Sequence, residues 1–228
     1  MMSDTHIPLP ERLRPRDLSE IIGQDHLLGE HAPLRQMIDQ GHLPSIIFWG
    51  PPGVGKTTIA LLLAQAVDRP FISLSALNTG VKELREVIAE SGDLLTPVVF
   101  IDEIHRFNKS QQDALLNAVE KGKITLIGAT TENPSFEVNS ALLSRCQVYT
   151  LNSLDEDAIQ TLLNKAIQTD KFLKERFIHI EEYDALIQFA AGDARKALNL
   201  IDLIASTFEP RSEEHTSELE SPCNLVCR

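Results

Sequence analysis

The sequence has few cysteines, no long hydrophobic run and no secretory signal, and each shortage excludes a class of protein. Its three cysteines are Cys146, Cys223 and Cys227, too few for the disulfide framework of a small secreted domain. The longest apolar run is Ile59–Ala64, whereas a membrane-spanning helix needs about 20 residues. Charged residues and prolines fill the N-terminal segment, where a signal peptide would carry an apolar core. We therefore expect a cytoplasmic protein without a membrane partner.

Positive charge is also in short supply. The 228 residues include 21 Lys and Arg against 33 Asp and Glu, a net charge of −12. This balance argues against broad, nonspecific attraction to nucleic acid, although it leaves room for a local basic patch. The hydrophobic fraction of 43% excludes a disordered or collagen-like chain. A folded protein of one to two domains is expected.

The C-terminal segment Arg211–Arg228 lacks the periodicity of either a helix or a strand. It resembles the translated read-through of a sequencing-library adapter, so we expect an artefactual tail and exclude it from the fold. Cys223 and Cys227 then form no metal site. The alternative is a genuine disordered tail. If the tail is foreign, we expect further domains after residue 210 to be missing from this chain.

Apolar, β-rich runs alternate with helical patterns through the first part of the chain. Strands are predicted at Ser45–Trp49, Phe71–Leu74, Pro97–Asp102, Ile124–Ala129 and Gln147–Leu151. Helices are predicted at Thr57–Val67, Val81–Glu90 and Ser110–Glu120. This alternation predicts an α/β fold, a parallel sheet flanked by helices, over residues 1–152.

After residue 152 the pattern changes to helical spacing alone. Leu154–Gln168, Glu181–Ala190 and Asp193–Phe208 each place apolar residues along one face. We therefore expect a small, all-helical domain over residues 153–210, with no further strand.

The first chemical motif lies between an apolar strand and an apolar helix. Residues Gly50–Thr57 read GPPGVGKT and fit the P-loop pattern G-x-x-x-x-G-K-[ST]. Glycines let backbone N–H groups turn towards phosphates, and the helix N-terminus adds a positive dipole end. Lys56 is expected to reach the β- and γ-phosphates of ATP, and Thr57 to bind Mg²⁺. The predicted nucleotide contacts are Gly50, Pro51, Pro52, Gly53, Val54, Gly55, Lys56, Thr57 and Thr58.

The second motif is an apolar strand that ends in two acids, Val98–Glu103 (VVFIDE). Taken alone, an Asp–Glu pair at a strand end is as often structural as functional. After a P-loop it favours a Walker B motif, in which Asp102 supports Mg²⁺ and Glu103 polarises the attacking water.

The two motifs, followed by a helical unit, resemble those of AAA+ ATPases. The segment 13–24 (LRP…IGQ) resembles the box that opens members of the clamp-loader clade and contacts the adenine side of the nucleotide. This resemblance implies that Leu13 and Arg14 bind nucleotide. Residues 144–146 (SRC) resemble the Ser-Arg-Cys element of the clade, which implies that Arg145 acts in trans, in the site of a neighbouring subunit.

Two further elements of that family have counterparts here. Gly192–Arg195 (GDAR) resembles sensor 2, which implies a role for Arg195, and Thr130 stands where sensor 1 is expected. Arg195 also lies in the first turn of a predicted helix, where the helix dipole disfavours a cation. That conflict favours a functional role over a solvated surface arginine.

Two longer strings, HRFNKSQQD at 105–113 and ATTENPSFE at 129–137, narrow the resemblance to the replication-associated recombination protein A family. The resemblance covers residues 7–210. It implies a DNA-dependent ATPase at stalled replication forks, acting in recombination and repair and associated with the nucleoid. It also implies homotetramers in the full-length protein, and single-strand-binding protein and replisome components as partners.

Several residues keep a structural alternative. Arg145 alone could be an ordinary surface arginine. Cys146 is better explained as a buried small residue than as a nucleophile. His105, next to the Walker B motif, is favoured as a structural or positioning residue over a proton-transfer group.

DNA contacts are the least specified part of the sequence. The candidates are Lys82, Arg85, Arg106 and Lys109. The alternative is a solvated helix face on which lysine and arginine balance nearby glutamates.

Competing functions are a clamp-loader subunit, a Holliday-junction branch-migration ATPase, and a scaffold that binds nucleotide without hydrolysis. The residues that argue against the scaffold are the intact Lys56, Asp102, Glu103, Arg145 and Arg195.

Overall fold

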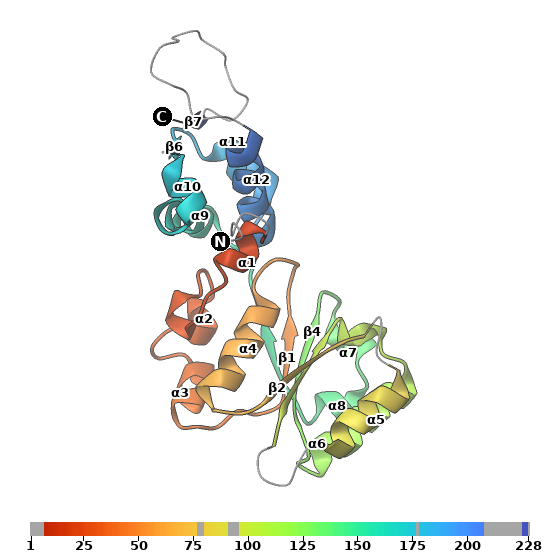
Figure 1. Ribbon diagram of the computed structural model, residues 1–228. Helices are drawn as coiled ribbons and strands as arrows, with labels where there is room; N and C mark the ends of the chain where they lie inside the picture. Colours follow the sequence, from red (N-terminus) through yellow and green to blue (C-terminus); the bar gives the residue numbers. More distant parts are fainter. Residues whose placement is uncertain (1–6, 77–79, 91–95, 177, 208–224, 228) are drawn as a thin grey trace. The chain divides into compact units, whose positions relative to one another are not determined.

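The computed structural model describes residues 7–76, 80–90, 96–176, 178–207 and 225–227. The chain divides into two compact units, which are described separately below and drawn in Figure 1. The sheet unit is Arg16–Asn152, and the helical unit combines residues up to Pro15 with those from Ser153 onwards. Within the described ranges, no helix is long and apolar enough to span a membrane.

Five strands form the parallel sheet of the sheet unit. They are β1 (Ile46–Trp49), β2 (Phe71–Ser75), β3 (Val98–Asp102), β4 (Thr125–Thr130) and β5 (Gln147–Thr150). Their order is β2-β3-β4-β1-β5, and every neighbouring pair is parallel. This confirms the predicted α/β fold, with all five strand ends within one residue of those predicted. Because parallel strands end at one edge, the segments after β1, β3 and β4 meet there (Figure 1).

Helices cover both faces of this sheet (Figure 1). One face carries α2 (Asp25–Leu28), α3 (Pro33–Asp39) and α4 (Lys56–Ala66), and the other carries α5 (Val81–Glu90), α6 (Lys109–Glu120) and α8 (Ser140–Leu143). The short elements η2 (Leu18–Glu20), η3 (Ile104–Arg106) and α7 (Pro134–Glu137) complete the unit. Because both faces are covered, β1, β3 and β4 are buried almost throughout, which explains their nearly continuous apolar sequences.

The string HRFNKSQQD builds the start of α6. The side chain of Asn108 accepts the backbone N–H of Gln111 at 3.0 Å, and that of Gln111 accepts the N–H of Asn108 at 2.9 Å, which forms a capping box. The buried Gln112 donates to two backbone carbonyls and accepts the N–H of Asn139 at 2.7 Å. These hydrogen bonds connect α6 to the segment that contains α7 and α8. Arg145 lies shortly after α8.

The helical unit contains α1 (Leu9–Arg12), α9 (Glu156–Thr169), α10 (Lys171–Glu175), α11 (Asp184–Ala190) and α12 (Ala194–Thr207). Nε of Arg12 lies 2.8 Å from Oδ2 of Asp170, and its Nη2 lies 3.1 Å from Oδ1 of Asp202. Burial works against the charge on Arg12, but its bonds to the two carboxylates prevail and raise its pKa. These ion pairs explain why α1 belongs to this unit, whereas residues 1–152 were expected to form one domain.

The predicted absence of strands after residue 152 is wrong. β6 (Ile178–Ile180) pairs in antiparallel register with β7 (Leu225–Cys227). β6 alternates buried, exposed, buried over only three residues, too short a pattern to stand out from the helical spacing around it. β7 belongs to the segment 211–228 that we expected to lie outside the fold.

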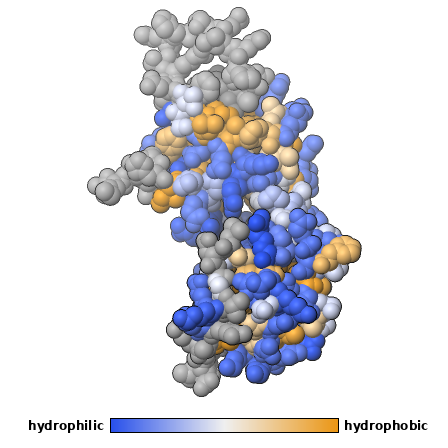
Figure 2. Space-filling model, turned by 90° about the vertical axis from the view of Figure 1, so that its right-hand side faces the viewer, coloured by the Kyte–Doolittle hydropathy of each residue, from blue (hydrophilic) through white to orange (hydrophobic). Residues whose placement is uncertain are grey.

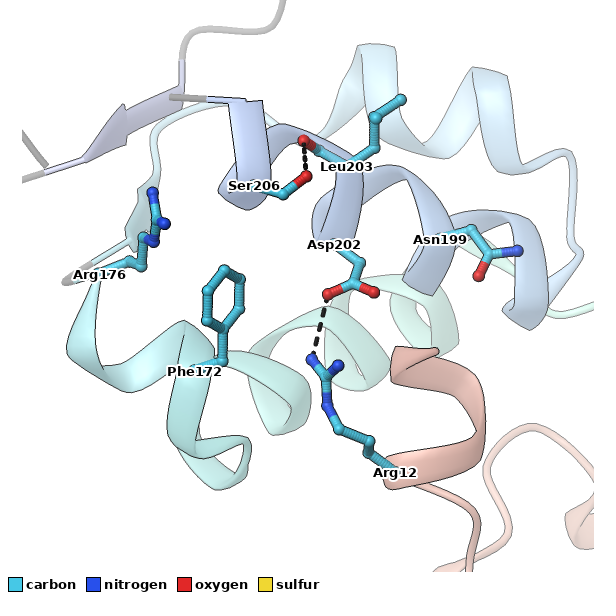
Figure 3. Close-up of a pocket in the computed structure, with 7 residues that line it drawn as sticks. All are labelled: Arg12, Phe172, Arg176, Asn199, Asp202, Leu203 and Ser206. Atoms are coloured by element: carbon cyan, nitrogen blue, oxygen red, sulfur yellow. Dashed lines mark hydrogen bonds and ion pairs between the residues drawn. The ribbon is translucent and has the colours of Figure 1, made fainter. Parts of the chain in front are cut away.

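A cavity of about 600 Å³ opens in the helical unit (Figure 3). Arg12 and Asp202 point towards one another from α1 and α12, and the ring of Phe172 lies beside them. The guanidinium of Arg176 is 4.8 Å from the centroid of this ring. The described lining of the cavity includes no residue that the sequence analysis assigned to a site, and its Arg12 is already bound by two carboxylates.

Candidate nucleotide site

The loop between β1 and α4 has the backbone of a phosphate cradle. Gly53 and Gly55 adopt φ angles of 74° and 93°, which residues with side chains rarely enter. Gly55 stands immediately before α4, and no described side chain caps this helix. The first N–H groups of α4 therefore lack intrahelical partners at the positive end of the helix dipole. An anion is the ligand that such an arrangement favours.

Gly50 fixes where this loop begins. Its backbone N–H donates to the carbonyl oxygen of Thr130 at 3.2 Å. A Cβ atom on Gly50 would lie 2.4 Å from the carbonyl oxygen of Leu151. Any side chain here would collide with backbone, so the position requires glycine and holds the loop between the ends of β4 and β5.

Lys56 is buried at the start of α4. Its Nζ donates to the carbonyl oxygens of Gly50 and Pro51, both at 2.7 Å. A cation at this end of a helix is disfavoured by the dipole. The two loop carbonyls nevertheless hold the ammonium group in a buried position at the start of α4, where a bound phosphate would offset its cost. The residues present therefore fit a nucleoside triphosphate.

Asp102 and Thr57 are the predicted magnesium ligands. Asp102 ends β3, Thr57 is in the first turn of α4, and α4 packs on β3. The described residues include no group of three or more His, Cys, Asp or Glu side chains that could hold a metal ion alone. Mg²⁺ in nucleotide sites takes one or two protein oxygens and completes its shell with phosphate and water. The carboxylate of Asp102 and the hydroxyl of Thr57 therefore fit a Mg²⁺ ion that binds together with a nucleotide.

Glu103 is held in an unusual backbone conformation directly after β3. Its φ of 55° and ψ of 47° lie in the left-handed region, which is disfavoured for residues with a Cβ and recurs at functional sites. Its Oε2 lies 3.2 Å from Nε2 of His105 and 3.9 Å from Nε of Arg106. The carboxylate is 29% exposed, so water can reach it.

Thr130 and His105 meet beside Glu103. Nδ1 of His105 lies 3.0 Å from Oγ1 of Thr130. Oγ1 of Thr130 also accepts the backbone N–H of Glu132 at 3.0 Å, and the Thr130 hydroxyl can donate to the carbonyl oxygen of Glu132 at 3.2 Å. Thr130 is fully buried, so in this structure its hydroxyl contacts protein groups. The structure thus links Glu103, His105 and Thr130, which the sequence analysis had assigned separately.

Arg145 follows α8 on the surface of the sheet unit. Its Nη1 donates to Oγ of Ser144 at 2.6 Å, and its Nη2 lies 2.7 Å from Oε1 of Glu120. The adjacent Cys146 is half-buried, and burial raises the pKa of its thiol to about 12. That shift keeps the thiol protonated at neutral pH and supports a packing role.

Three predicted site residues belong to the helical unit. Leu13 is half-buried, and Arg14 pairs with Glu11 at 2.7 Å. Arg195 is exposed on α12. Oδ1 of Asp193 accepts the backbone N–H of Arg195 at 2.8 Å. The Asp193 carboxylate offsets the unfavourable position of the Arg195 cation, which weakens the electrostatic argument for that residue.

The candidate DNA contacts come from three elements. Lys82 lies on α5, with its Nζ 3.6 Å from Oε1 of Glu86, as the solvated-face alternative predicts. Arg106 on η3 and Lys109 at the start of α6 are exposed. The side chain of Arg85 lies outside the described residues. Figure 2 shows that the face of the sheet unit bearing α5 is largely hydrophilic.

The sequence analysis missed two residues that this structure brings into play. Glu120 sits at the end of α6, 25 positions before its partner Arg145, and looks like any surface acid. Gly128 interrupts an apolar strand, a pattern that can mark a close approach of neighbouring atoms. Its spacing alone did not show which atoms approach.

Residues 46–154 match the family described as "ATPase family associated with various cellular activities (AAA)". Replication-associated recombination protein A of Coxiella burnetii is 49% identical over 210 residues, which cover 90% of this chain and 48% of that protein. ATPase WRNIP1 of Dictyostelium discoideum is 42% identical over 227 residues, which cover 96% of this chain and 26% of that protein. The chain spans about half the length of the curated recombination protein that it matches.

Solved structures give a consistent match. The Thermotoga maritima RuvB Holliday junction branch migration motor superposes with a TM-score of 0.64 at 29% identity. The match covers 82% of this chain and 63% of that one.

Proposed function

We propose that this chain binds Mg²⁺–ATP and hydrolyses it, because residues 46–154 match the AAA ATPase family and the chain is similar to replication-associated recombination protein A of Coxiella burnetii. One observation carries the proposal. The uncapped start of α4, with the buried Lys56, lies at the same edge of the sheet as Asp102 and Glu103. A phosphate cradle, a metal-binding carboxylate and an exposed base are thus combined in one unit.

Each residue of this edge has a task in the proposed reaction. Lys56 and the first N–H groups of α4 bind phosphate oxygens, while Thr57 and Asp102 hold Mg²⁺. The ion supplies positive charge against the phosphates. Glu103 accepts a proton from the water whose oxygen bonds to the γ-phosphorus, as the bond from that phosphorus to the β–γ bridging oxygen breaks. ADP and inorganic phosphate are the products.

We further propose that the site is completed from outside the sheet unit. Leu13, Arg14 and Arg195 of the helical unit are assigned to nucleotide binding. Arg145 is assigned to the site of a neighbouring subunit, with the homotetramer as the working assembly of the full-length protein. The exposed position of Arg145 supports this assignment, since a residue that acts in trans must reach the surface.

The names of the relatives indicate the biological process. Replication-associated recombination protein A is named for that process, and we propose the same setting here, with hydrolysis stimulated by DNA at stalled forks. Lys82, Arg85, Arg106 and Lys109 are the candidate contacts. Single-strand-binding protein and replisome components are the proposed partners, within the nucleoid.

A second candidate is a Holliday-junction motor, which the similarity to RuvB favours. The two are separated by measuring phosphate release with a panel of DNA substrates at low salt: gapped forks, single strands, four-way junctions and blunt duplexes. We expect forks or gaps to give the largest stimulation and higher salt to reduce it, since phosphate contacts release counterions. Stimulation by four-way junctions alone would favour the RuvB-like function. Nucleotide binding without phosphate release on any of these DNAs would favour the scaffold.

A further inference from the structure

The ring of His105 bridges the ends of two neighbouring strands. Nε2 faces the carboxylate of Glu103 at 3.2 Å, after β3, and Nδ1 faces the hydroxyl of Thr130 at 3.0 Å, at the end of β4. The His105 side chain is 13% exposed, so few water molecules compete for these bonds. We propose that His105 is a positioning residue that holds Glu103 for water activation, with Thr130 as its buried anchor. This inference rests on the proposed ATPase function.

Gly128 explains why the ring reaches both partners. A Cβ atom on Gly128 would lie 2.9 Å from Cδ1 of Ile104 and 2.7 Å from Cδ1 of Ile47. The glycine therefore lets the buried Ile104 rest directly on β4. Because η3 begins at Ile104, this contact keeps η3 close to β4. His105, the next residue of η3, can then bring its Nδ1 to the hydroxyl of Thr130.

The backbone of Glu103 completes the geometry. Its left-handed conformation turns the chain sharply between β3 and η3, so its carboxylate meets the side chain two residues later. A residue with a Cβ occupies this region only when its surroundings enforce it. The bond to His105 is one such constraint, because it is the shorter of the two contacts that hold the Glu103 carboxylate, 3.2 Å against 3.9 Å to the exposed Arg106.

The hydrogen-bond directions are consistent with a single chain. An ionised carboxylate can only accept, so Nε2 of His105 carries the proton towards Glu103. In the neutral ring Nδ1 is then an acceptor. The single hydroxyl proton of Thr130 can go either to Nδ1 at 3.0 Å or to the carbonyl oxygen of Glu132 at 3.2 Å, and the shorter distance favours Nδ1. The Thr130 oxygen is itself fixed because it accepts the N–H of Glu132. The order from donor to acceptor is therefore Glu132, Thr130, His105, Glu103.

This series of hydrogen bonds is consistent with the full burial of Thr130. A hydroxyl that touched the nucleotide directly would need an open path to it. Here the only side chain that the described contacts place on Oγ1 of Thr130 is that of His105. The influence of Thr130 on hydrolysis is thus exerted through His105 and Glu103.

A spectroscopic experiment tests the hydrogen bonds between Thr130, His105 and Glu103 without requiring ATP turnover. The whole chain is labelled with ¹⁵N-histidine, and the ring resonances of His105 are assigned with His105→Asn. We expect an Nε2–H ring whose Nδ1 shift moves in Thr130→Val and whose Nε2 shift moves in Glu103→Gln. Thr125→Val is the matched control. It removes another buried hydroxyl of β4, one that accepts from Arg69 at 2.9 Å, and should leave the His105 shifts unchanged. Ring resonances indifferent to Thr130→Val and Glu103→Gln overturn the proposal.

Steady-state kinetics give the second readout. Because the positioning is lost while the P-loop is untouched, His105→Ala should lower kcat by about 10- to 100-fold and leave the ATP KM within error. The conservative variant Thr130→Ser should restore most of the kcat that Thr130→Val loses. The double variant His105→Ala with Thr130→Val should be no slower than the slower single variant. A purely structural role predicts instead multiplied losses and a lower Tm. Hydrolysis by His105→Ala at the wild-type rate would overturn the positioning role of His105 but not the proposed ATPase function. Wild-type protein that binds ATP but never hydrolyses it would overturn the proposed ATPase function.

Discussion

Nη2 of Arg145 lies 2.7 Å from Oε1 of Glu120, and the two side chains are 44% and 41% exposed. An arginine that acts on a neighbouring subunit must leave this partner before it can reach a phosphate. An exposed ion pair of this kind contributes about 0.2–1 kcal/mol. The pair is therefore weak enough to break and strong enough to alter how often Arg145 is available.

The first prediction concerns Glu120. Glu120→Gln keeps the shape of the side chain and removes its charge, so Arg145 is released more readily. We expect ATP turnover at limiting protein concentration to rise by about two- to fivefold, the equivalent of the exposed ion pair. Glu137→Gln is the control, because it removes another exposed glutamate charge outside this pair. Equal rates for both variants and the wild type would show that Glu120 does not restrain Arg145.

The second prediction concerns Lys56. Lys56→Ala removes a charge-assisted contact worth roughly 1.5–3 kcal/mol, so affinity for a fluorescent ATP analogue should fall by well over tenfold. Lys123→Ala, which removes an exposed lysine at the other end of the sheet unit's β4, should bind normally. Circular dichroism shows whether both variants are folded. Unchanged affinity in folded Lys56→Ala would remove the P-loop from nucleotide binding.

The third prediction concerns the ion pairs that hold α1 in the helical unit. Asp170 is 6% exposed, accepts two bonds from Arg12 and also caps α10 through the N–H of Leu173. Asp170→Ala leaves Arg12 with one carboxylate, and the free energy of unfolding should fall by about 3–5 kcal/mol, as for other broken buried pairs. Asp202→Ala removes a single bond to Arg12 at a carboxylate that is 26% exposed and should cost less. Urea denaturation followed by far-ultraviolet circular dichroism measures both, and the reverse ranking would contradict the prediction.

The fourth prediction concerns Cys146. With its pKa raised to about 12 by burial, the reactive thiolate is scarce at pH 8, on the order of one molecule in ten thousand. Alkylation by iodoacetamide should be about a thousandfold slower than for an ordinary thiol with a pKa near 8.5. Its rate should still climb with pH above 9, since the thiolate fraction grows until the pKa is reached. Mass spectrometry of the peptide that contains residue 146 follows the reaction, and urea provides the unfolded reference. Rapid labelling of the native protein at pH 8 would contradict the burial.

The sheet and the two phosphate-binding motifs could be predicted because their signals are local. Val98–Asp102 is a continuous apolar strand, and GPPGVGKT at Gly50–Thr57 combines its turn, its cation and its hydroxyl in eight consecutive positions. The resemblance string HRFNKSQQD could also be read, but not its physical role. The structure shows that Asn108 and Gln111 cap α6.

What the sequence could not provide are pairings between distant residues. His105 meets Thr130 because β3 and β4 are neighbours in register, and α1 joins the helical unit because Arg12 finds Asp170, 158 positions later. Neither pair has a periodic signature. The strand β6 was missed for a related reason, since three residues acquire a strand conformation only from their partner.

The last prediction tests whether Arg145 acts in trans. An arginine finger can contribute 10³–10⁵ in rate to phosphoryl transfer, so the site of one subunit is complete for binding but incomplete for catalysis. ATP turnover per chain should therefore increase with protein concentration, as more chains contact a second copy.

Mixing two inactive variants makes the test decisive. Arg145→Ala retains the base Glu103, and Glu103→Gln retains the guanidinium, while the amide that replaces the base cannot accept a proton at pH 7. Each variant alone should bind ATP and hydrolyse it at least about 100-fold more slowly than the wild type. In the mixture, one kind of interface pairs an intact Glu103 with an intact Arg145, so activity should recover in proportion to the fraction of such interfaces. Mixing Arg145→Ala with itself at the same total concentration is the control. If the mixture stays inactive while the wild type turns over at a rate independent of concentration, Arg145 serves its own subunit, and the ion pair with Glu120 is then the contact that any model of its action must explain.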